Sequence, residues 1–424
     1  MGGKLTGIDG EWRIRVENGR NRGYGSGGCG SGAAARAAAG WLFAGRLLAG
    51  CLLAGWSAVA LAAAPTVGPA AKPQTATVAE RVETGVLGGA SYRIDMPTHW
   101  NGTLIVYYHG YSETPVVFEK GEDNTVGSGF AGRGFAVVQS GYSVAGFAVE
   151  QAMSETETLR RYFVAHYGQP RETYVTGHSM GGELTMATIE SYPGRYNGAL
   201  ALCGLLEPTT WAIEHGGAML AAFDYYYPGL IPGPEHVAAS VDLSSTLAKK
   251  VQTHLHDNPT GYAEMKALGH FKTDEDMAGV LVFFAFIERD FEQKLGAPLL
   301  NNANLIYFGG PDDNALNAGV RRYTASNAAL GYLKTWYTPT GVLDRPMLAV
   351  HTTYDPVIPP DTVSLYADQV QRMGSSRFFV QQFVEADGHC NISPEQTLTA
   401  MDELLDWVHD GHRPTAGLVP EQAH

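Results

Sequence analysis

The most informative part of this 424-residue sequence reads Tyr174-Val175-Thr176-Gly177-His178-Ser179-Met180-Gly181-Gly182. A β-branched and aromatic run enters its Gly-x-Ser-x-Gly pattern, and a helical run, residues 183–189, leaves it. This order predicts a strand, a very tight turn and a helix, with Ser179 in a strained backbone conformation at the turn. Gly177 and Gly181 have a steric reason to be glycine, because side chains there would collide across the turn. The free N–H groups of the helix should point at whatever Ser179 attacks.

A serine hydroxyl is a poor nucleophile near neutral pH, so it needs a neighbouring base and a group that orients this base. His389 is the best candidate base, because it lies in a short glycine-containing loop after the last predicted strand. Asp355 follows an apolar strand and precedes a proline, which places it in a turn at the carboxyl end of that strand, where loops carry function. Asp361 and Asp387 are alternatives, although Asp387 is so close to His389 in sequence that the geometry is awkward. A serine on an ordinary Gly-rich turn is the competing interpretation.

Other histidines compete with His389. His351 ends a core strand and is expected to pack there, and His178 is expected to point away from the site. The pair His254 and His256 lacks surrounding metal ligands, so a solvated helix face is the simpler interpretation and no metal is predicted.

Acyl transfer also needs hydrogen-bond donors for the oxyanion. The backbone N–H of Met180 is one candidate, because this residue follows the nucleophile. The second donor should come from the loop after an early central strand, which ends at His109-Gly110-Tyr111. The N–H of Tyr111 is the prediction, with the hydroxyl of Ser112 as a helper.

Strand and helix signals alternate over the rest of the chain, which predicts the α/β class. Strands are predicted at residues 80–86, 90–97, 102–108, 135–139, 173–176, 198–203, 345–351 and 378–384. Helices are predicted at residues 149–167, 361–373 and 394–409, in addition to the helix after Ser179. The first two strands form a hairpin, and the later alternation favours a mainly parallel sheet with helices on both faces. The tail from Pro414 onward is expected to be loose.

Residues 205–345 break this alternation with helical runs at 219–225, 241–255, 276–295 and 315–333. We expect an inserted, mainly helical cap, and a core formed by residues 65–204 and 346–424. Several cap aromatics are candidates to line a pocket, although most should form the cap's own core. These aromatics are Phe223, Tyr225, Tyr226, Tyr227, Phe283, Phe284 and Phe286.

Residues 1–64 are predicted to be a targeting leader. A continuous apolar run, 47–59, is too short for a comfortable membrane span, and the small residues before Pro65 resemble a signal-peptidase site. Leu48-Ala49-Gly50-Cys51 also resembles a bacterial lipoprotein box, so lipid anchoring is an alternative. We expect a secreted or periplasmic protein with no stable membrane span in the mature chain.

The charge of the chain excludes several classes of partner. Its formal net charge is −14, and removal of residues 1–64 leaves 22 basic and 40 acidic residues, or −18. No cluster of Lys and Arg remains, so nucleic acid and anionic membranes are poor partners. A hydrophobic content of 45% argues against a disordered chain. A neutral small-molecule or polymeric substrate fits this composition better.

The motif around Ser179, the His109-Gly110 turn, Asp355 in Tyr-Asp-Pro and Gly388-His389 together resemble the α/β-hydrolase superfamily. They are similar to secreted bacterial esterase-like enzymes with prolyl-oligopeptidase-type or lipase-type cores. The resemblance covers roughly residues 80–204 and 345–410 and implies a triad of Ser179, His389 and Asp355. The Tyr111 and Met180 pair also resembles the oxyanion hole of cutinase-like polyester hydrolases, which lack a cap of this size.

Two of the four cysteines lie outside the leader. Tannases and feruloyl esterases place a cysteine directly before the nucleophile, bonded to one directly after the histidine. Here Cys390 follows His389, but His178 precedes the serine. Cys203 offers a variant, because it ends the strand expected beside the strand that leads to Ser179. We predict a Cys203–Cys390 disulfide, with two buried free cysteines as the alternative.

The leading hypothesis is a secreted serine hydrolase that cleaves carboxylic esters through an acyl-enzyme on Ser179 and needs no cofactor. A serine peptidase acting on small peptides is the alternative within hydrolases, although no propeller domain that would sieve peptides is evident. A catalytically inactive hydrolase fold used for binding is the alternative from another class. It is disfavoured because every catalytic position holds a competent residue.

Overall fold

The computed structural model describes residues 81–122 and 124–419. The predicted leader, residues 1–64, lies outside the described residues.

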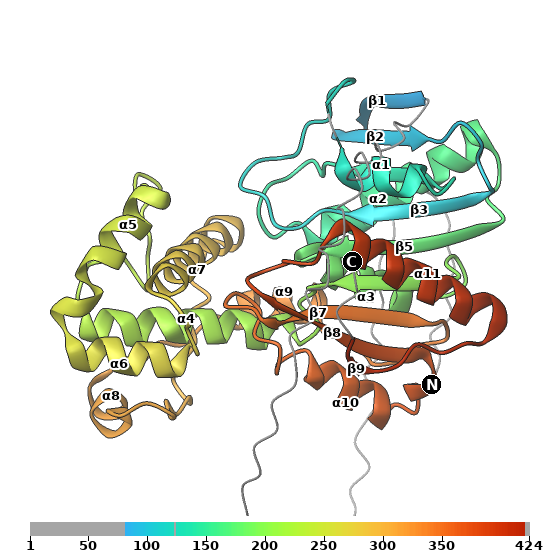
Figure 1. Ribbon diagram of the computed structural model, residues 1–424. Helices are drawn as coiled ribbons and strands as arrows, with labels where there is room; N and C mark the ends of the chain where they lie inside the picture. Colours follow the sequence, from blue (N-terminus) through green and yellow to red (C-terminus); the bar gives the residue numbers. More distant parts are fainter. Residues whose placement is uncertain (1–80, 123, 420–424) are drawn as a thin grey trace, which may run out of the picture. The chain divides into compact units, whose positions relative to one another are not determined.

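One nine-stranded sheet organises the described residues (Figure 1). Its strands are β1 (Arg81–Leu87), β2 (Ala90–Met96), β3 (Thr103–Tyr108), β4 (Ala136–Ser140), β5 (Glu172–His178), β6 (Gly198–Leu202), β7 (Met347–Tyr354), β8 (Phe379–Asp387) and β9 (Gly417–Leu418). Across the sheet the order is β1-β2-β4-β3-β5-β6-β7-β8-β9. The pairs β1–β2 and β2–β4 are antiparallel, and all other neighbours are parallel. The predicted mainly parallel sheet with an opening hairpin is therefore confirmed.

Helices cover both faces of this sheet. They are α1 (Thr125–Ala131), α2 (Val149–Tyr167), α3 (Met180–Ser191), α10 (Ser364–Arg372) and α11 (Pro394–Asp410). Leu159, Leu184 and Tyr366 join α2, α3 and α10 to one apolar cluster, whereas Phe130 and Leu404 join α1 and α11 to another. Strands β3, β4 and β6 are buried along their whole length, as expected for parallel strands between two helical layers.

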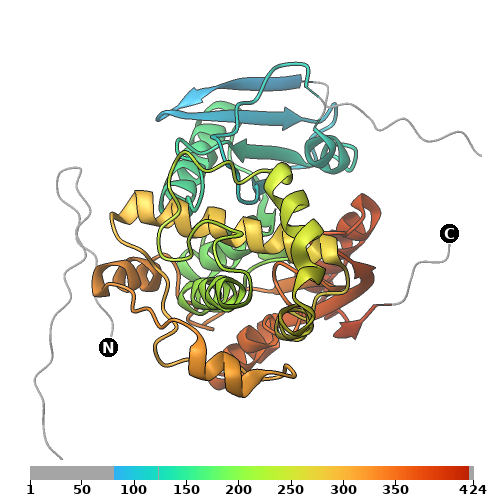
Figure 2. The same ribbon diagram turned by 90° about the vertical axis from the view of Figure 1, so that its left-hand side faces the viewer.

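The chain between β6 and β7 is helical. It holds α4 (Thr209–Tyr226), α5 (Ser245–His254), the short 3₁₀ turn η1 (Leu255–Asp257), α6 (Pro259–Leu268), α7 (Asp274–Leu295), α8 (Asp313–Gly319) and α9 (Asn327–Thr335); a second 3₁₀ turn, η2 (Ser376–Phe378), precedes β8. Figure 2 shows these helices from the cap side. Phe223, Val251, Met265 and Leu281 belong to an apolar cluster of their own, so the cap has its own core. Cap and sheet nevertheless form one compact unit.

The structure corrects several predicted elements in the cap. The single helix predicted at 315–333 is two helices, α8 and α9, because the segment between them is extended where the backbone N–H of Tyr323 donates to Oδ1 of Asn302 at 2.7 Å. Helix α6 was not predicted, although it carries a start signal. Oδ1 of Asn258 accepts from the N–H of Gly261 at 3.0 Å, and Pro259 is the first helical residue.

Two further corrections concern the core. The segment before β4, for which no helix was predicted, contains α1. Only three of its seven residues are buried, and two of these, Gly127 and Ala131, are small, so the sequence shows no clear helical periodicity. A Cβ on Gly127 would lie 2.5 Å from the carboxylate of Asp95, which explains this glycine inside a helix. The tail predicted to be loose contains β9, which pairs with Gln382 and Phe383 of β8.

Candidate active site

Ser179 is the single residue between β5 and α3. Its backbone has φ 59° and ψ −123°, a conformation that residues with side chains rarely adopt. A Cβ on Gly177 would lie 2.5 Å from the carbonyl oxygen of Gly181, and a Cβ on Gly181 would come closer still to the carbonyl oxygen of Tyr108. The predicted tight turn and the steric need for both glycines are therefore confirmed.

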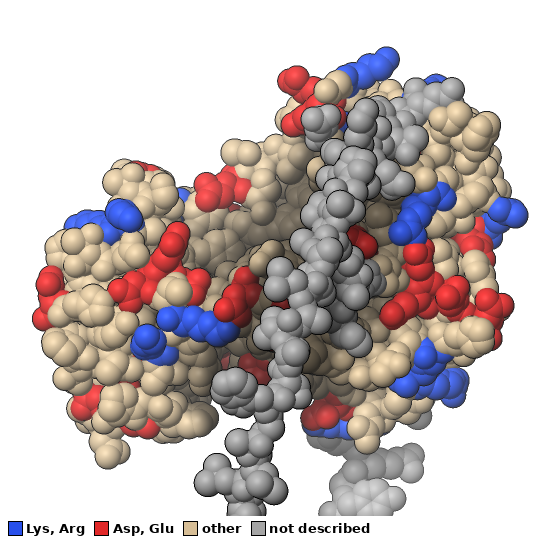
Figure 3. Space-filling view, viewed as in Figure 1, with Lys and Arg blue, Asp and Glu red and all other residues tan. Residues whose placement is uncertain are grey.

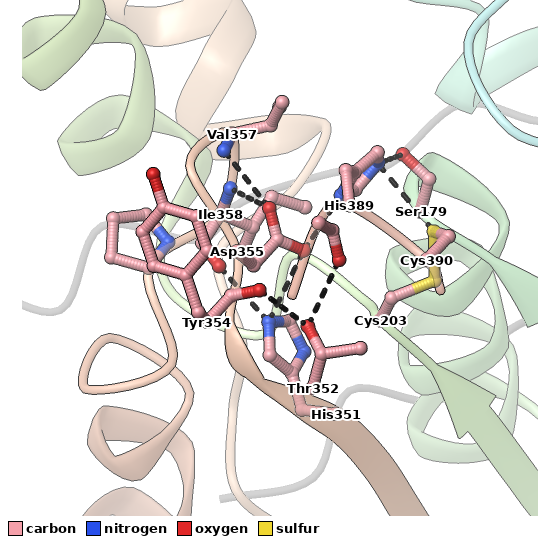
Figure 4. Close-up of polar contacts among 12 residues, drawn as sticks. Ser179, Cys203, His351, Thr352, Tyr354, Asp355, Val357, Ile358, His389 and Cys390 are labelled. Atoms are coloured by element: carbon pink, nitrogen blue, oxygen red, sulfur yellow. Dashed lines mark hydrogen bonds and ion pairs between the residues drawn. A yellow bond between two sulfur atoms is a disulfide. The ribbon is translucent and has the colours of Figure 1, made fainter. Parts of the chain in front are cut away.

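Three side chains from distant parts of the chain meet beside this turn (Figure 4). Nε2 of His389 lies 2.8 Å from Oγ of Ser179, and Nδ1 of His389 lies 2.7 Å from Oδ2 of Asp355. Because an ionised carboxylate only accepts hydrogen bonds, Nδ1 carries the proton and Nε2 accepts from the serine hydroxyl. The three residues follow β5, β7 and β8, whose carboxyl ends lie at the same edge of the sheet.

Asp355 is held in place by its own turn. Its Oδ1 accepts hydrogen bonds from the N–H groups of Val357 and Ile358, each at 2.9 Å. Burial alone would raise the pKa of Asp355, but the hydrogen bond and positive charge of His389 and the Ile358 N–H outweigh burial and keep this pKa below its ordinary value. The carboxylate is therefore ionised and oriented toward the histidine ring.

The competing histidines do not occupy the position beside Ser179, although Nε2 of His351 lies 3.5 Å from Oδ2 of Asp355. His351 is buried in its strand, and its Nε2 lies 2.9 Å from the carbonyl oxygen of Ile358, so it packs as predicted. Nδ1 of His178 lies 3.1 Å from the hydroxyl of Tyr107, and His178 lines a different pocket from Ser179. Burial, with the charge of His389, lowers the pKa of His178 to about 4, so this ring is neutral near neutral pH.

The remaining candidates lie away from Ser179. His254 bonds a backbone carbonyl of its own helix, and Nε2 of His256 lies 2.8 Å from Oδ2 of Asp274. The alternative carboxylate, Asp387, forms an ion pair with Lys272. Within residues 81–122 and 124–419, no group of three or more His, Cys, Asp or Glu side chains is arranged to hold a metal ion.

The backbone that follows β3 passes directly beside Ser179. A Cβ on Gly110 would lie 3.2 Å from Cβ of Ser179, so only a residue without a side chain fits this approach comfortably. Met180 begins α3, and the first N–H groups of a helix have no partner inside it. Tyr111 and Met180 both line the pocket that contains Ser179. The two N–H groups predicted to bind an oxyanion thus belong to residues at this pocket.

The disulfide between Cys203 and Cys390 is present, with a Cα–Cα distance of 5.2 Å across a sequence separation of 187. Cys203 directly follows β6, and its N–H donates to the carbonyl oxygen of Val350 at 2.8 Å. Sγ of Cys390 lies 3.5 Å from Nε2 of His389 (Figure 4). The disulfide therefore joins the loop of His389 to the end of β6, the strand beside β5. It does not join this loop to residue 178, which precedes Ser179.

A pocket of about 790 Å³, open solvent at its mouth included, lies beside Ser179 and extends under the cap. Its apolar walls comprise Tyr111, Phe147, Leu205, Trp211, Phe283, Phe284 and Ile287. Of the aromatics predicted as candidates, Phe283 and Phe284 line this pocket, whereas Phe223 and Tyr227 pack in the cap core. Phe286 lines a neighbouring groove.

Three buried glutamates that were not predicted from the sequence also line the pocket: Glu183, Glu207 and Glu288. Burial raises the pKa of Glu183 and of Glu288 to about 8 and that of Glu207 to about 7. One carboxyl oxygen of Glu183 and one of Glu288 have no partner among the described residues, and none of the described Lys or Arg side chains lines the pocket. No sequence signal marks Glu183 or Glu288, because a glutamate in a helical run is normally expected to face solvent.

These raised pKa values predict a pH-dependent stability. The folded state keeps a proton on Glu183 that the unfolded chain releases, so this group lowers the free energy of unfolding as pH rises from about 4.5 to about 8. Glu183→Gln removes this dependence. We compare the free energies of unfolding in urea of the variant and the wild type. Their difference, variant minus wild type, should increase by at least about 1 kcal/mol between about pH 5 and pH 8.5. Parallel pH profiles for the two proteins would contradict the prediction.

Charged side chains of both signs are mixed on the surface in view. In Figure 3, the uncovered surface carries Lys and Arg interspersed with Asp and Glu, without one continuous basic patch. Among the described residues, none of the helices combines the length and apolar character needed to cross a bilayer.

Known proteins resemble parts of this chain. Residues 87–273, less than half of the chain, match a family described as "Tannase-like family of unknown function (DUF6351)". The o-phthalyl amidase of Xanthobacter agilis is 21% identical over 410 residues, a match that covers 77% of this chain and 87% of that protein.

Solved structures with related folds are more distant in sequence. Feruloyl esterase B from Aspergillus oryzae matches with a TM-score of 0.44 and 14% identity, covering 78% of this chain and 80% of that chain. The acylaminoacyl peptidase of Pyrococcus horikoshii matches with a TM-score of 0.40 and 11% identity, and the match covers 77% of this chain but only 41% of the peptidase. The strand order of the sheet, the strand–turn–helix at Ser179 and the helices inserted between β6 and β7 are the features of an α/β-hydrolase fold.

Proposed function

We propose that this chain is a serine hydrolase that cleaves carboxylic esters, with Ser179 as nucleophile, His389 as general base and Asp355 as the group that orients the histidine. The observation that carries the proposal is the continuous hydrogen-bonded path from Oγ of Ser179 through both ring nitrogens of His389 to a buried carboxylate. The strained turn that exposes the serine at a helix N-terminus supports the same assignment.

The geometry supports a two-step acyl transfer. Nε2 of His389 takes the hydroxyl proton while Oγ of Ser179 attacks the ester carbonyl carbon, and Asp355 stabilises the imidazolium that forms. The N–H groups of Tyr111 and Met180 are proposed to bind the oxyanion of the tetrahedral intermediate. His389 then gives its proton to the leaving alcohol, and the acyl group stays on Oγ. Water, deprotonated by the same ring, releases the acid and restores the serine.

The pocket between Phe283, Phe284 and Ser179 is the proposed acyl site. Its aromatic walls favour an apolar acyl group. Export of the protein is part of the proposal. It is supported by the apolar run of the predicted leader and by the Cys203–Cys390 disulfide, since such bonds persist in oxidising compartments.

Hydrolysis of p-nitrophenyl esters tests the proposal. We expect the wild type to release p-nitrophenol from at least one member of a series that includes acetate, butyrate, octanoate and benzoate. Ser179→Ala, purified in the same way, should remain at the rate of buffer alone. Equal rates for the two proteins on every ester would refute the proposed reaction.

Amide hydrolysis is the second candidate, because the similar protein from Xanthobacter agilis is an amidase. The same triad serves both reactions, and an amide differs mainly in needing better protonation of its leaving group. A matched p-nitrophenyl ester and p-nitroanilide with the same acyl group separate the two. Faster turnover of the ester in kcat/KM supports the esterase proposal, and faster turnover of the anilide supports the amidase.

A further inference from the structure

Four side chains link the cap to the sheet edge that carries the proposed triad, and we call them the Tyr354 cluster: Lys272, Asp276, Tyr354 and Asp387. The hydroxyl of Tyr354 donates to Oδ2 of Asp276 and accepts from the backbone N–H of Lys272, both at 2.9 Å. Nζ of Lys272 lies 4.4 Å from the centroid of the Tyr354 ring and 2.5 Å from Oδ1 of Asp387. Two cap residues, Lys272 and Asp276, thus contact Tyr354 of the core, and Lys272 also contacts Asp387.

The two core members are neighbours of the triad in sequence and in space. Tyr354 is the last residue of β7 and precedes Asp355, as Figure 4 shows, and Asp387 is the last residue of β8, two residues before His389. The N–H of Gly388 donates to the carbonyl oxygen of Tyr354 at 2.8 Å, so the two loops are already bonded to each other. Contacts from the cap to Tyr354 and Asp387 therefore restrain both the loop of Asp355 and the loop of His389.

Helix α7 extends from this cluster along the whole site. Asp276 lies in its first turn, and Phe283 and Phe284 further along line the pocket beside Ser179. The ring of Phe283 meets the ring of Tyr111 edge-on, with centroids 5.7 Å apart. Near the other end of the helix, Oδ2 of Asp290 accepts a hydrogen bond from the N–H of Phe147, which also lines the pocket. One helix thus contacts the acid–base loops, the acyl site and the proposed oxyanion loop.

The hydroxyl of Tyr354 should contribute more than the ion pair does. Oδ2 of Asp276 also accepts a hydrogen bond from the N–H of Thr273 as part of the capping box of α7. The position of this carboxylate is therefore set by its own helix, independently of Tyr354. The side chains of Lys272 and Asp387 are 51% and 64% exposed, and solvent weakens exposed ion pairs, so this pair contributes little.

We propose that the Tyr354 cluster consists of positioning residues for the ester hydrolysis proposed above. It fixes the start of α7 against the loops of Asp355 and His389. The position of the acyl pocket relative to Ser179 and His389 is thereby held constant. Small misplacements at such a site cost large factors in rate, because the reacting groups must be held within about 0.5 Å of the productive arrangement. The inference rests on the proposed function. The experiments below give different results if the inference is wrong and if the proposed function is wrong.

Tyr354→Phe is the main variant, since it keeps the ring and the Lys272 contact but removes the two hydroxyl hydrogen bonds. Tyr262→Phe is the matched control. The hydroxyl of Tyr262 also donates to an acid in the first turn of α7, Oδ1 of Asp274 at 2.9 Å, but the other partners of the Tyr262 side chain among the described residues are Lys266 and His256, which lie outside both triad loops. We expect Tyr354→Phe to lower kcat about tenfold with KM within about twofold, and Tyr262→Phe to leave both within about twofold.

A second readout does not depend on knowing the substrate: the rate at which a fluorophosphonate labels Ser179. We expect this rate to fall in Tyr354→Phe in parallel with kcat, and to stay at the wild-type value in Tyr262→Phe. Asp276→Asn keeps an oxygen for the helix cap, and we expect Tyr354→Phe combined with Asp276→Asn to be no slower than the slower single variant.

Three results would overturn the inference: wild-type kcat and labelling in Tyr354→Phe, equal losses in Tyr354→Phe and Tyr262→Phe, or additive losses in the double variant. Equal losses would mean that α7 is merely destabilised. A wild type that neither hydrolyses esters nor reacts with the fluorophosphonate would instead refute the proposed function itself. If the wild type is labelled but cleaves no ester in the series, the labelling rates alone decide on the Tyr354 cluster.

Discussion

Ser179→Ala and His389→Ala should each lower kcat for the best ester by a factor on the order of 10⁴ to 10⁶, and the double variant should be no slower than either single one. The reason is that the two side chains act as one unit. Without the imidazole the hydroxyl, 2.8 Å from Nε2, has no base, and without the hydroxyl the base has nothing to activate. Steady-state kinetics of the three variants and the wild type provide the measurement.

The control for this series is His254→Ala. His254 lies on a cap helix and bonds only a backbone carbonyl of its own turn, so its removal should leave kcat within about twofold. Thermal unfolding of every variant verifies that each one is folded. Single variants that lose only a few-fold, or losses that multiply in the double variant, would contradict the idea of a serine–histidine unit.

Asp355→Asn should lower kcat by a factor on the order of 10⁴ while leaving the fold intact. The buried carboxylate accepts from Nδ1 of His389 at 2.7 Å and thereby keeps Nε2 free to accept the serine proton. An amide at this position can donate to Nδ1 and so favour the tautomer with the proton on Nε2, which cannot act as a base. It also removes the negative charge that stabilises the imidazolium.

Asp361→Asn is the matched control, because Asp361 is an exposed carboxylate in the segment after the same strand. We expect its kcat to stay within about twofold of the wild type. A kcat for Asp355→Asn within tenfold of the wild type would mean that another group orients the histidine. Equal losses in the two variants would point to general damage to this segment.

The fold was largely predictable because local patterns and global architecture agree in this chain. Strands such as Thr103–Tyr108 are apolar on both faces, and only a sheet covered by two helical layers buries both. The divided helix at 315–333 was not predictable, because the extended segment around Tyr323 depends on Asn302, which is distant in sequence. Strand β9 was missed for a similar reason: a two-residue strand has no periodicity and exists through its pairing with β8.

The residues that meet at the site were predictable where chemistry restricts the choice. Ser179, Asp355 and His389 each follow a parallel strand, and the carboxyl ends of such strands gather at one edge. Cys203 was predictable as a partner of Cys390 because it directly follows β6, the strand next to β5.

The buried glutamates of the pocket and the Tyr354 cluster were not predictable. Glu288 and Asp276 lie on one helix, yet one is buried beside the acyl site and the other bonds a tyrosine of the core. Only the packing of the cap on the sheet distinguishes these two acids. Sequence periodicity does not contain this information, since it describes one helix at a time.

The most direct test of the account is the site at which a fluorophosphonate reacts with the folded wild-type chain. Intact mass should increase by one adduct per chain, and peptide mapping should place it on Ser179. Denatured protein and His389→Ala should react far more slowly, because the hydroxyl is activated only beside the imidazole. A folded wild type that gains no adduct, or that gains it on another residue, would contradict the claim that Ser179 is the nucleophile of this protein.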